Sequence, residues 1–242
     1  YARTSAENLF IPTFATTAAG GIYVPASALK GPLRTSLLME RAGEAQWKEL
    51  AARLEGAERT PRYPAEVLET ATLGNAGVSR TRSLLLGDSA AIPSGGATRI
   101  YLLRTSTLLP KGSKLELGWK MSPRGAVEAR RPGDSTPTFA EMALPGTQFT
   151  GAFDESPALS KPEMLRALRW REAAGARMFT QAAYAAAEKL IAVQRAYAET
   201  TGLGAVVQSM DQLSQRLAAA RERADSCLLC HGWGAGFLAK SV

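Results

Sequence analysis

Three residues near the end of the chain have types and a spacing that could do chemistry. Cys227, Cys230 and His231 form the pattern C-L-L-C-H, and they include both cysteines and the single histidine of the sequence. Two thiols at this spacing can form thioethers with the vinyl groups of a haem, and the adjacent imidazole can then bind the iron. One interpretation of the chain is therefore a c-type haem protein that carries electrons.

The place of this motif, on a predicted helix near the C-terminus, resembles that in cytochromes c′. The resemblance covers Cys227, Cys230 and His231 alone. It implies haem c as cofactor, held on the last helix of a four-helix bundle. Because the chain has one histidine, a sixth iron ligand would be a methionine, such as Met178 or Met210, or would be absent.

Other interpretations use the same atoms differently. Cys227 and Cys230 could form a disulfide or a redox pair, although no thioredoxin-like βαβ pattern surrounds them. Zinc needs four ligands, and the motif supplies three. Two thiols buried on a helix face would be purely structural. We expect this last role or a local disulfide, with no cofactor, and keep haem attachment as the alternative.

The sequence offers little else for catalysis. Ser89 follows Gly87 and Asp88 in a turn-like segment, but a serine nucleophile needs a histidine base, and His231 is the single histidine. The glycines of residues 232–236 do not join a strand to a helix, so they do not form a dinucleotide-binding motif. We therefore expect a protein that is not an enzyme.

The positive charge of the chain is concentrated in its middle. The net charge is +7, and residues 72–133 account for the whole excess. Such a segment attracts an acidic protein, nucleic acid or anionic lipid. We expect the basic side chains of residues 80–131 to gather on one face, and the candidate contacts are Arg80, Arg82, Arg130 and Arg131.

The N-terminal part reads as an apolar arm followed by a helix. Prolines and glycines interrupt residues 8–33, which favours an extended segment over a helix. We expect this arm to pack on another subunit, because its apolar side chains would be costly to leave in water. The side chains concerned are Phe10, Ile11, Phe14 and Ile22. Residues 35–55 have apolar residues at helical spacing, and Thr35 could cap that helix.

The next segments predict a small β region and a long helical hairpin. A short helix is expected over residues 64–72, and residues 73–153 then become rich in glycine and proline. Alternation there predicts a hairpin whose strands include residues 99–103 and 115–119. Residues 161–199 and 205–226 have helical periodicity, with a capping box at Ser160 and Glu163 and a break at residues 200–204. These two helices should lie antiparallel.

Together these patterns predict an α+β protein with three parts. They are the arm (residues 1–34), a mixed helix and basic β region (35–153), and the helical hairpin with the cysteine motif (154–242). No run of about 18 apolar residues is present, so no transmembrane segment is expected. The leading function is a structural or assembly subunit of a multi-protein complex. The sequence, which begins at Tyr1, indicates neither the complex nor the cellular compartment.

Overall fold

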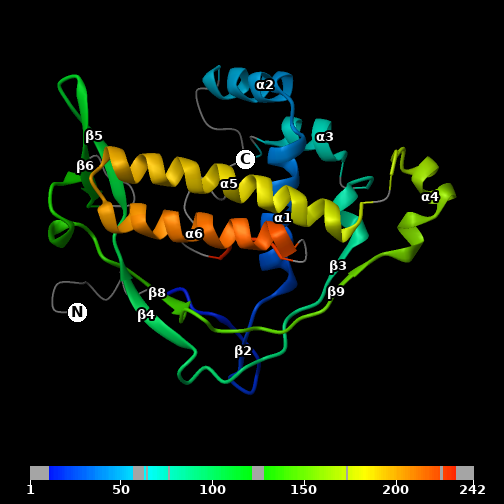
Figure 1. Cartoon of the computed structure of the whole chain (residues 1–242), viewed down its shortest axis with the longest axis horizontal. Helices are drawn as coiled ribbons and strands as arrows, with labels where there is room; N and C mark the ends of the chain where they lie inside the picture. The colour runs from blue at the N-terminus through cyan, green and yellow to red at the C-terminus, as the bar shows by residue number, and fades with distance from the viewer. Residues whose placement is uncertain are drawn as a thin grey trace. The chain divides into compact units, whose positions relative to one another are not determined.

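The computed structural model describes residues 11–56, 63, 65–75, 77–121, 128–172, 174–223 and 226–232. Helices and small antiparallel sheets occupy largely separate stretches of the chain, which confirms the predicted α+β class (Figure 1). The helices are α1 (Ala26–Arg41), α2 (Glu44–Glu55), α3 (Glu66–Leu73), α4 (Pro162–Ala167), α5 (Ala176–Thr200) and α6 (Gly204–Arg223), with short 3-10 turns η2 (Arg80–Ser83), η3 (Pro132–Asp134) and η4 (Pro157–Ser160). The strands are β1 (Ala15–Thr16), β2 (Ile22–Tyr23), β3 (Leu84–Leu86), β4 (Thr98–Leu103), β5 (Ser106–Lys111), β6 (Lys114–Lys120), β7 (Glu128–Ala129), β8 (Thr138–Ala143) and β9 (Phe153–Glu155).

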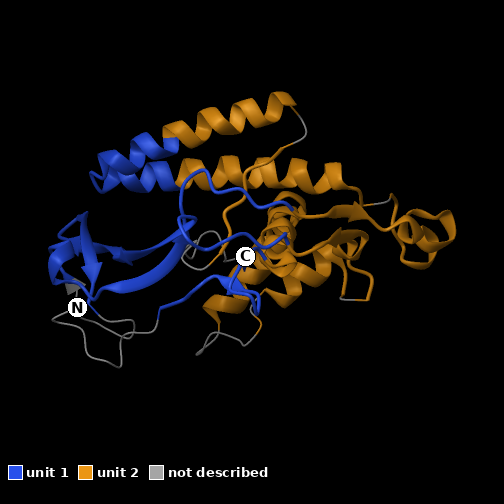
Figure 2. Cartoon of the chain, turned by 90° about the horizontal axis from the view of Figure 1, so that it is seen from below, with its two compact units in different colours: residues 1–24, 89–150, 194–210 blue, residues 25–88, 151–193, 211–242 orange. Residues whose placement is uncertain are grey.

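The chain forms two compact units, and each is assembled from separated segments (Figure 2). Unit 1 comprises residues 1–24, 89–150 and 194–210, and unit 2 comprises residues 25–88, 151–193 and 211–242. The three parts expected from the sequence followed chain order, so they differ from this grouping. None of the described helices is long and apolar enough to cross a membrane.

The core of unit 2 is built by α1, α3, β3 and the first turns of α5. Apolar side chains from these elements are almost completely buried: Leu33, Leu37, Leu38, Leu68, Leu73, Leu84, Ala174, Phe179, Ala182 and Ala183. Phe179, Ala182 and Ala183 are the α5 residues in this cluster. Burying each large side chain contributes about 1.5–3 kcal/mol, which explains why these elements hold together.

Helix α1 corrects the expectation of an extended segment up to residue 33. The helix begins at Ala26 and continues through Gly31 and Pro32. Proline inside a helix costs about 3 kcal/mol because it removes one backbone hydrogen bond. Burial of Leu33 and Leu37 on the core offsets this cost. Thr35 consequently lies inside α1 and caps nothing, and the predicted helix 35–55 is broken between Arg41 and Glu44.

The β region of residues 73–153 is confirmed, but its strands pair differently from the prediction. Strand β4 pairs with β8, so Leu102 lies opposite Phe139. Strand β6 instead forms its hairpin with β5, where Pro110 lies opposite Leu115. The turn is tight because Gly112 has a φ of 60°, a conformation that glycine adopts without strain. Residues 99–103 and 115–119 therefore belong to two different sheets.

The C-terminal helices form the expected pair, with one correction. Helices α5 and α6 are separated at residues 201–203, and in unit 2 the Arg221 guanidinium lies 5.1 Å from the ring centre of Tyr184. That contact joins residues nearly equidistant from the break, as an antiparallel pair requires. A single helix over residues 161–199 is wrong, because α4 ends at Ala167 and α5 begins at Ala176. The capping box is also wrong, since the Ser160 hydroxyl donates to the Ser156 carbonyl.

Candidate partner-binding surfaces

The cysteine motif does not lie on a helix. Helix α6 ends at Arg223, and residues 226–232 have no regular secondary structure. Cys227 packs against the core of unit 2 together with Leu229, and this burial raises the pKa of its thiol. Cys230 and His231 are exposed. The expected helical placement, which carried the resemblance to cytochromes c′, is therefore wrong.

The surroundings of the motif favour a packing role for its first cysteine. A c-type haem needs both thiols to face one cavity, whereas the Cys227 side chain faces apolar residues and Cys230 is exposed. Among the described residues, no group of three or more histidine, cysteine or acidic side chains is placed to hold a metal ion. Structural thiols remain the interpretation that we carry forward.

The N-terminal stretch contacts its own unit. The Glu141 carboxylate of β8 accepts hydrogen bonds from the Phe14 backbone N (3.0 Å) and from the Thr98 hydroxyl (2.6 Å). The Glu141 N–H in turn donates to the Pro12 carbonyl at 2.9 Å. The Phe14 ring stacks on Phe149 with ring centres 5.9 Å apart. One half-buried carboxylate and one aromatic pair thus anchor this stretch to β8 and the segment beyond it.

The four apolar side chains predicted to pack on another subunit differ in burial. Ile22 is 1% exposed, and it exchanges backbone hydrogen bonds with Ile92. Ile11 and Phe14 are half-buried. Phe10 lies outside the described residues. Packing of this stretch on another subunit stays a prediction.

The predicted basic contacts lie in two different units. Arg80 and Arg82 are on η2 of unit 2, where the Arg80 side chain is only 17% exposed. Arg130 and Arg131 follow β7 in unit 1, and both are exposed. The four arginines therefore form two pairs that belong to different units. That all four lie on one face remains a prediction.

Several exposed cations lie on the sheet β5–β6–β7 of unit 1 and on the turn that follows it. We define the basic meander as these side chains: Lys111, Lys114, Lys120, Arg130 and Arg131. Glu116 pairs with Lys111 at 2.7 Å, and this hydrogen bond lowers the pKa of the Glu116 carboxyl, with Arg130 acting in the same direction. That these cations form one basic surface remains a prediction.

Strand β4 adds an exposed apolar surface to the same unit. Ile100 and Leu102 are 55% and 51% exposed on one face of the strand, and Tyr101 is also exposed on the other. Their cross-strand partners on β8 include Phe139 and Ala140, which are buried. We call residues 99–102 the exposed strand. Sequence reasoning missed this surface, although its only signal was visible: three consecutive apolar residues without the alternation of a half-buried strand.

Two solved structures share this fold. One is a chain of the Csm–crRNA–target RNA ternary complex of a type III-A CRISPR-Cas system, with a TM-score of 0.52, 15% sequence identity and 94% of this chain covered. The other is Csm5 of T. onnurineus, with a TM-score of 0.50, 16% identity and 94% of this chain covered. This chain spans 61% and 65% of their respective lengths. No family model and no curated protein matches the sequence.

Proposed function

We propose that the chain is a non-enzymatic structural subunit of a multi-protein complex that contains RNA, and that the basic meander contacts the RNA. The proposal is carried by the exposed cationic side chains of β5, β6 and the turn after β7. Such side chains attract the phosphate backbone of a nucleic acid. The fold supports the proposal, because one similar chain comes from a complex with crRNA and target RNA.

The exposed strand supports the role of a subunit. Adjacent apolar side chains on β4 are unfavourable in water, and monomeric proteins rarely leave such a strand edge uncovered. A protein neighbour would cover Ile100 and Leu102 while RNA lies along the basic meander.

The RNA contact is tested by charge reversal. Arg130→Glu with Arg131→Glu should weaken binding of a labelled single-stranded RNA, measured by fluorescence anisotropy. Binding by the unmodified chain should also fall between about 50 mM and about 200 mM salt, because phosphate contacts release counterions. The matched control, Lys189→Glu with Arg216→Glu, makes the same change in charge at exposed positions of unit 2. It should bind RNA like the unmodified chain at equal ionic strength.

Two results would contradict the proposal. RNA binding that both double variants weaken equally would show a response to net charge rather than to a site. Absence of RNA binding by the unmodified chain at low salt would remove the RNA contact altogether.

A further inference from the structure

Unit 2 contains a cavity whose wall is cationic. It has a volume of about 540 Å³, and it lies between the end of α3 with the segment before η2 on one side and the end of α4 on the other. Its polar lining includes Arg80, Arg169, Thr72 and Asn75, and its apolar lining includes Trp170. The described lining residues include no acidic side chain. The size falls within the range of roughly 300–1,000 Å³ found for small-molecule sites.

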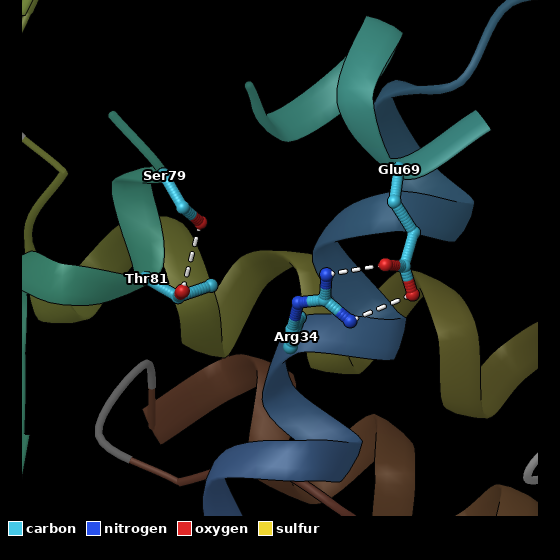
Figure 3. A network of polar contacts seen from close by, with 4 residues as sticks. All are labelled: Arg34, Glu69, Ser79 and Thr81. Atoms are coloured by element: carbon cyan, nitrogen blue, oxygen red, sulfur yellow. Dashed lines mark hydrogen bonds and ion pairs between the residues drawn. The ribbon is translucent and has the colours of Figure 1, made fainter. Parts of the chain in front are cut away.

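Buried hydroxyl groups fix the turn that carries Arg80. The hydroxyls of Ser79 and Thr81, the residues on either side of Arg80, lie 2.9 Å apart and are buried (Figure 3). The Ser83 hydroxyl interacts with the Arg80 carbonyl at 2.8 Å and with the Ala174 carbonyl at 2.5 Å. The backbone of Arg80 is therefore held before any ligand arrives, which lowers the entropy cost of binding.

The opposite wall is tied to the same turn. The indole N–H of Trp170 donates to the Val78 carbonyl at 2.7 Å, so the residue after Arg169 is bonded to the segment just before η2. On the α3 side, Arg34 of α1 makes a bidentate contact with Glu69 at 2.7 and 2.6 Å (Figure 3). The segments that carry Arg80 and Arg169 are therefore joined to each other by a hydrogen bond.

One carboxylate lies near Arg80: Oε1 of Glu172 is 3.8 Å from the Arg80 Nη1 atom, and the Glu172 side chain is 66% exposed. The Nη1 atom is buried and has no hydrogen-bond partner. Burial lowers the pKa of the Arg80 guanidinium; Arg41 and Arg171 lower it further, while Glu172 opposes them. Arginine still stays protonated. The buried Thr72 hydroxyl also has no hydrogen-bond partner. Arg80 and Thr72, which carry these two atoms, both line the cavity.

Arg169 occupies a backbone conformation in which arginine is unusual. Helix α4 ends in a Schellman arrangement, with Trp170 N bonded to the Leu165 carbonyl and Arg169 N bonded to the Arg166 carbonyl. Arg169 takes the left-handed position, with a φ of 56°. Glycine is the usual residue there, so the arginine side chain is retained at a conformational cost.

We propose that this cavity binds a phosphate group through Arg80 and Arg169. Guanidinium groups match phosphate oxygens in geometry and charge, and the apolar wall beside them suits the remainder of a nucleotide. The phosphate could belong to a free nucleotide or to an RNA chain. The proposal rests on unit 2 alone and does not depend on the RNA contact of the basic meander.

The test measures binding of inorganic phosphate and of AMP to the full chain by isothermal titration calorimetry at constant ionic strength. We expect saturable binding of both. Arg80→Gln and Arg169→Gln should each weaken it about tenfold or more, because each removes a charge-assisted hydrogen bond. Arg216→Gln, at an exposed position of α6 in the same unit, should leave binding within about twofold.

Arg169→Gly keeps the test valid if Arg80→Gln fails to fold. Glycine suits the left-handed position, so this variant should unfold at a higher temperature than the unmodified chain yet bind phosphate more weakly. Competition then identifies the source of the phosphate group. If single-stranded RNA displaces bound AMP, the site is assigned to RNA. If AMP stays bound, the site is assigned to free nucleotides.

The proposal is overturned if neither phosphate nor AMP binds saturably, or if the Arg80 and Arg169 variants bind as tightly as Arg216→Gln. These results differ from failure of the basic meander, which would leave phosphate binding intact.

Discussion

At the scale of single residues, Arg169 has a left-handed backbone conformation that lowers the stability of the fold. A side chain at a φ of 56° costs about 1 kcal/mol relative to glycine. We expect Arg169→Gly to raise the free energy of unfolding by about 1 kcal/mol, measured by urea denaturation. Arg166→Gly, one turn earlier inside α4, is the matched control and should lower it by about 1 kcal/mol, because glycine weakens a helix interior. Equal effects at both positions would contradict this assignment.

The two cysteines should differ in reactivity. Burial raises the pKa of the Cys227 thiol, which lowers its content of reactive thiolate, and it also restricts access of a reagent, whereas Cys230 is exposed. Because Cys230 is exposed, iodoacetamide should label it first, and mass spectrometry of peptides measures the order. Labelling of Cys227 should accelerate as pH rises through its raised pKa. Stability should fall over the same interval, because the folded state favours the neutral thiol.

Denaturation supplies the control for this experiment, since both thiols should react alike in urea. The same protein should be colourless, without a Soret band, and its mass should equal the sequence mass. A covalently attached haem would overturn this expectation and restore the electron-carrier interpretation of Cys227, Cys230 and His231.

At the scale of elements, one bidentate ion pair links two helices of unit 2. Arg34 on α1 and Glu69 on α3 have side chains 40% and 29% exposed, so solvent screens part of their attraction. A double-mutant cycle with Arg34→Gln and Glu69→Gln should give a coupling of about 0.5–1 kcal/mol that shrinks at high salt. The exposed pair Glu44 and Lys48 within α2 should give about 0.3 kcal/mol. A larger coupling energy for Glu44 and Lys48 than for Arg34 and Glu69 would contradict the expectation that the bidentate, less exposed pair is the stronger one.

The elements also mark where sequence reasoning stopped. Long periodic segments were predictable, so α5, α6 and the change of character at residue 73 were found. Helix α1 was missed because Gly31 and Pro32 oppose it locally, while the tertiary burial that favours it comes from α3 and α5. The pairing of β4 with β8 was missed because these strands are distant in sequence. Local sequence patterns do not indicate which residues of two distant strands lie opposite each other.

The candidate sites divide in the same way. Segregated charge can be counted from the sequence, so a basic surface around Arg130 and Arg131 could be proposed from it and stays a prediction. The cavity could not be proposed, because Arg80 and Arg169 are distant in sequence and line one cavity only after the chain has folded. The cysteine motif led to a wrong expectation about its place. Its spacing is compatible with haem attachment, but α6 ends before the motif, so the motif does not lie on that helix.

At the scale of the whole molecule, both units depend on the C-terminal helices. Unit 1 includes residues 194–210, and unit 2 includes residues 211–242. A chain that ends at residue 193 loses part of both. We expect this truncated chain to lack a cooperative thermal transition by circular dichroism, while the full chain shows one. A truncated chain with an equally sharp transition would show that the units close without these segments.

The interleaving of the two units has a consequence for biosynthesis. During translation, residues 1–24 leave the ribosome long before residues 194–210, although both belong to unit 1. Apolar side chains such as Ile22 must therefore wait for most of the chain before their unit is complete. Early segments of this protein are thus natural clients for a chaperone, and any premature stop before residue 194 yields a product in which neither unit is whole and which quality control can recognise.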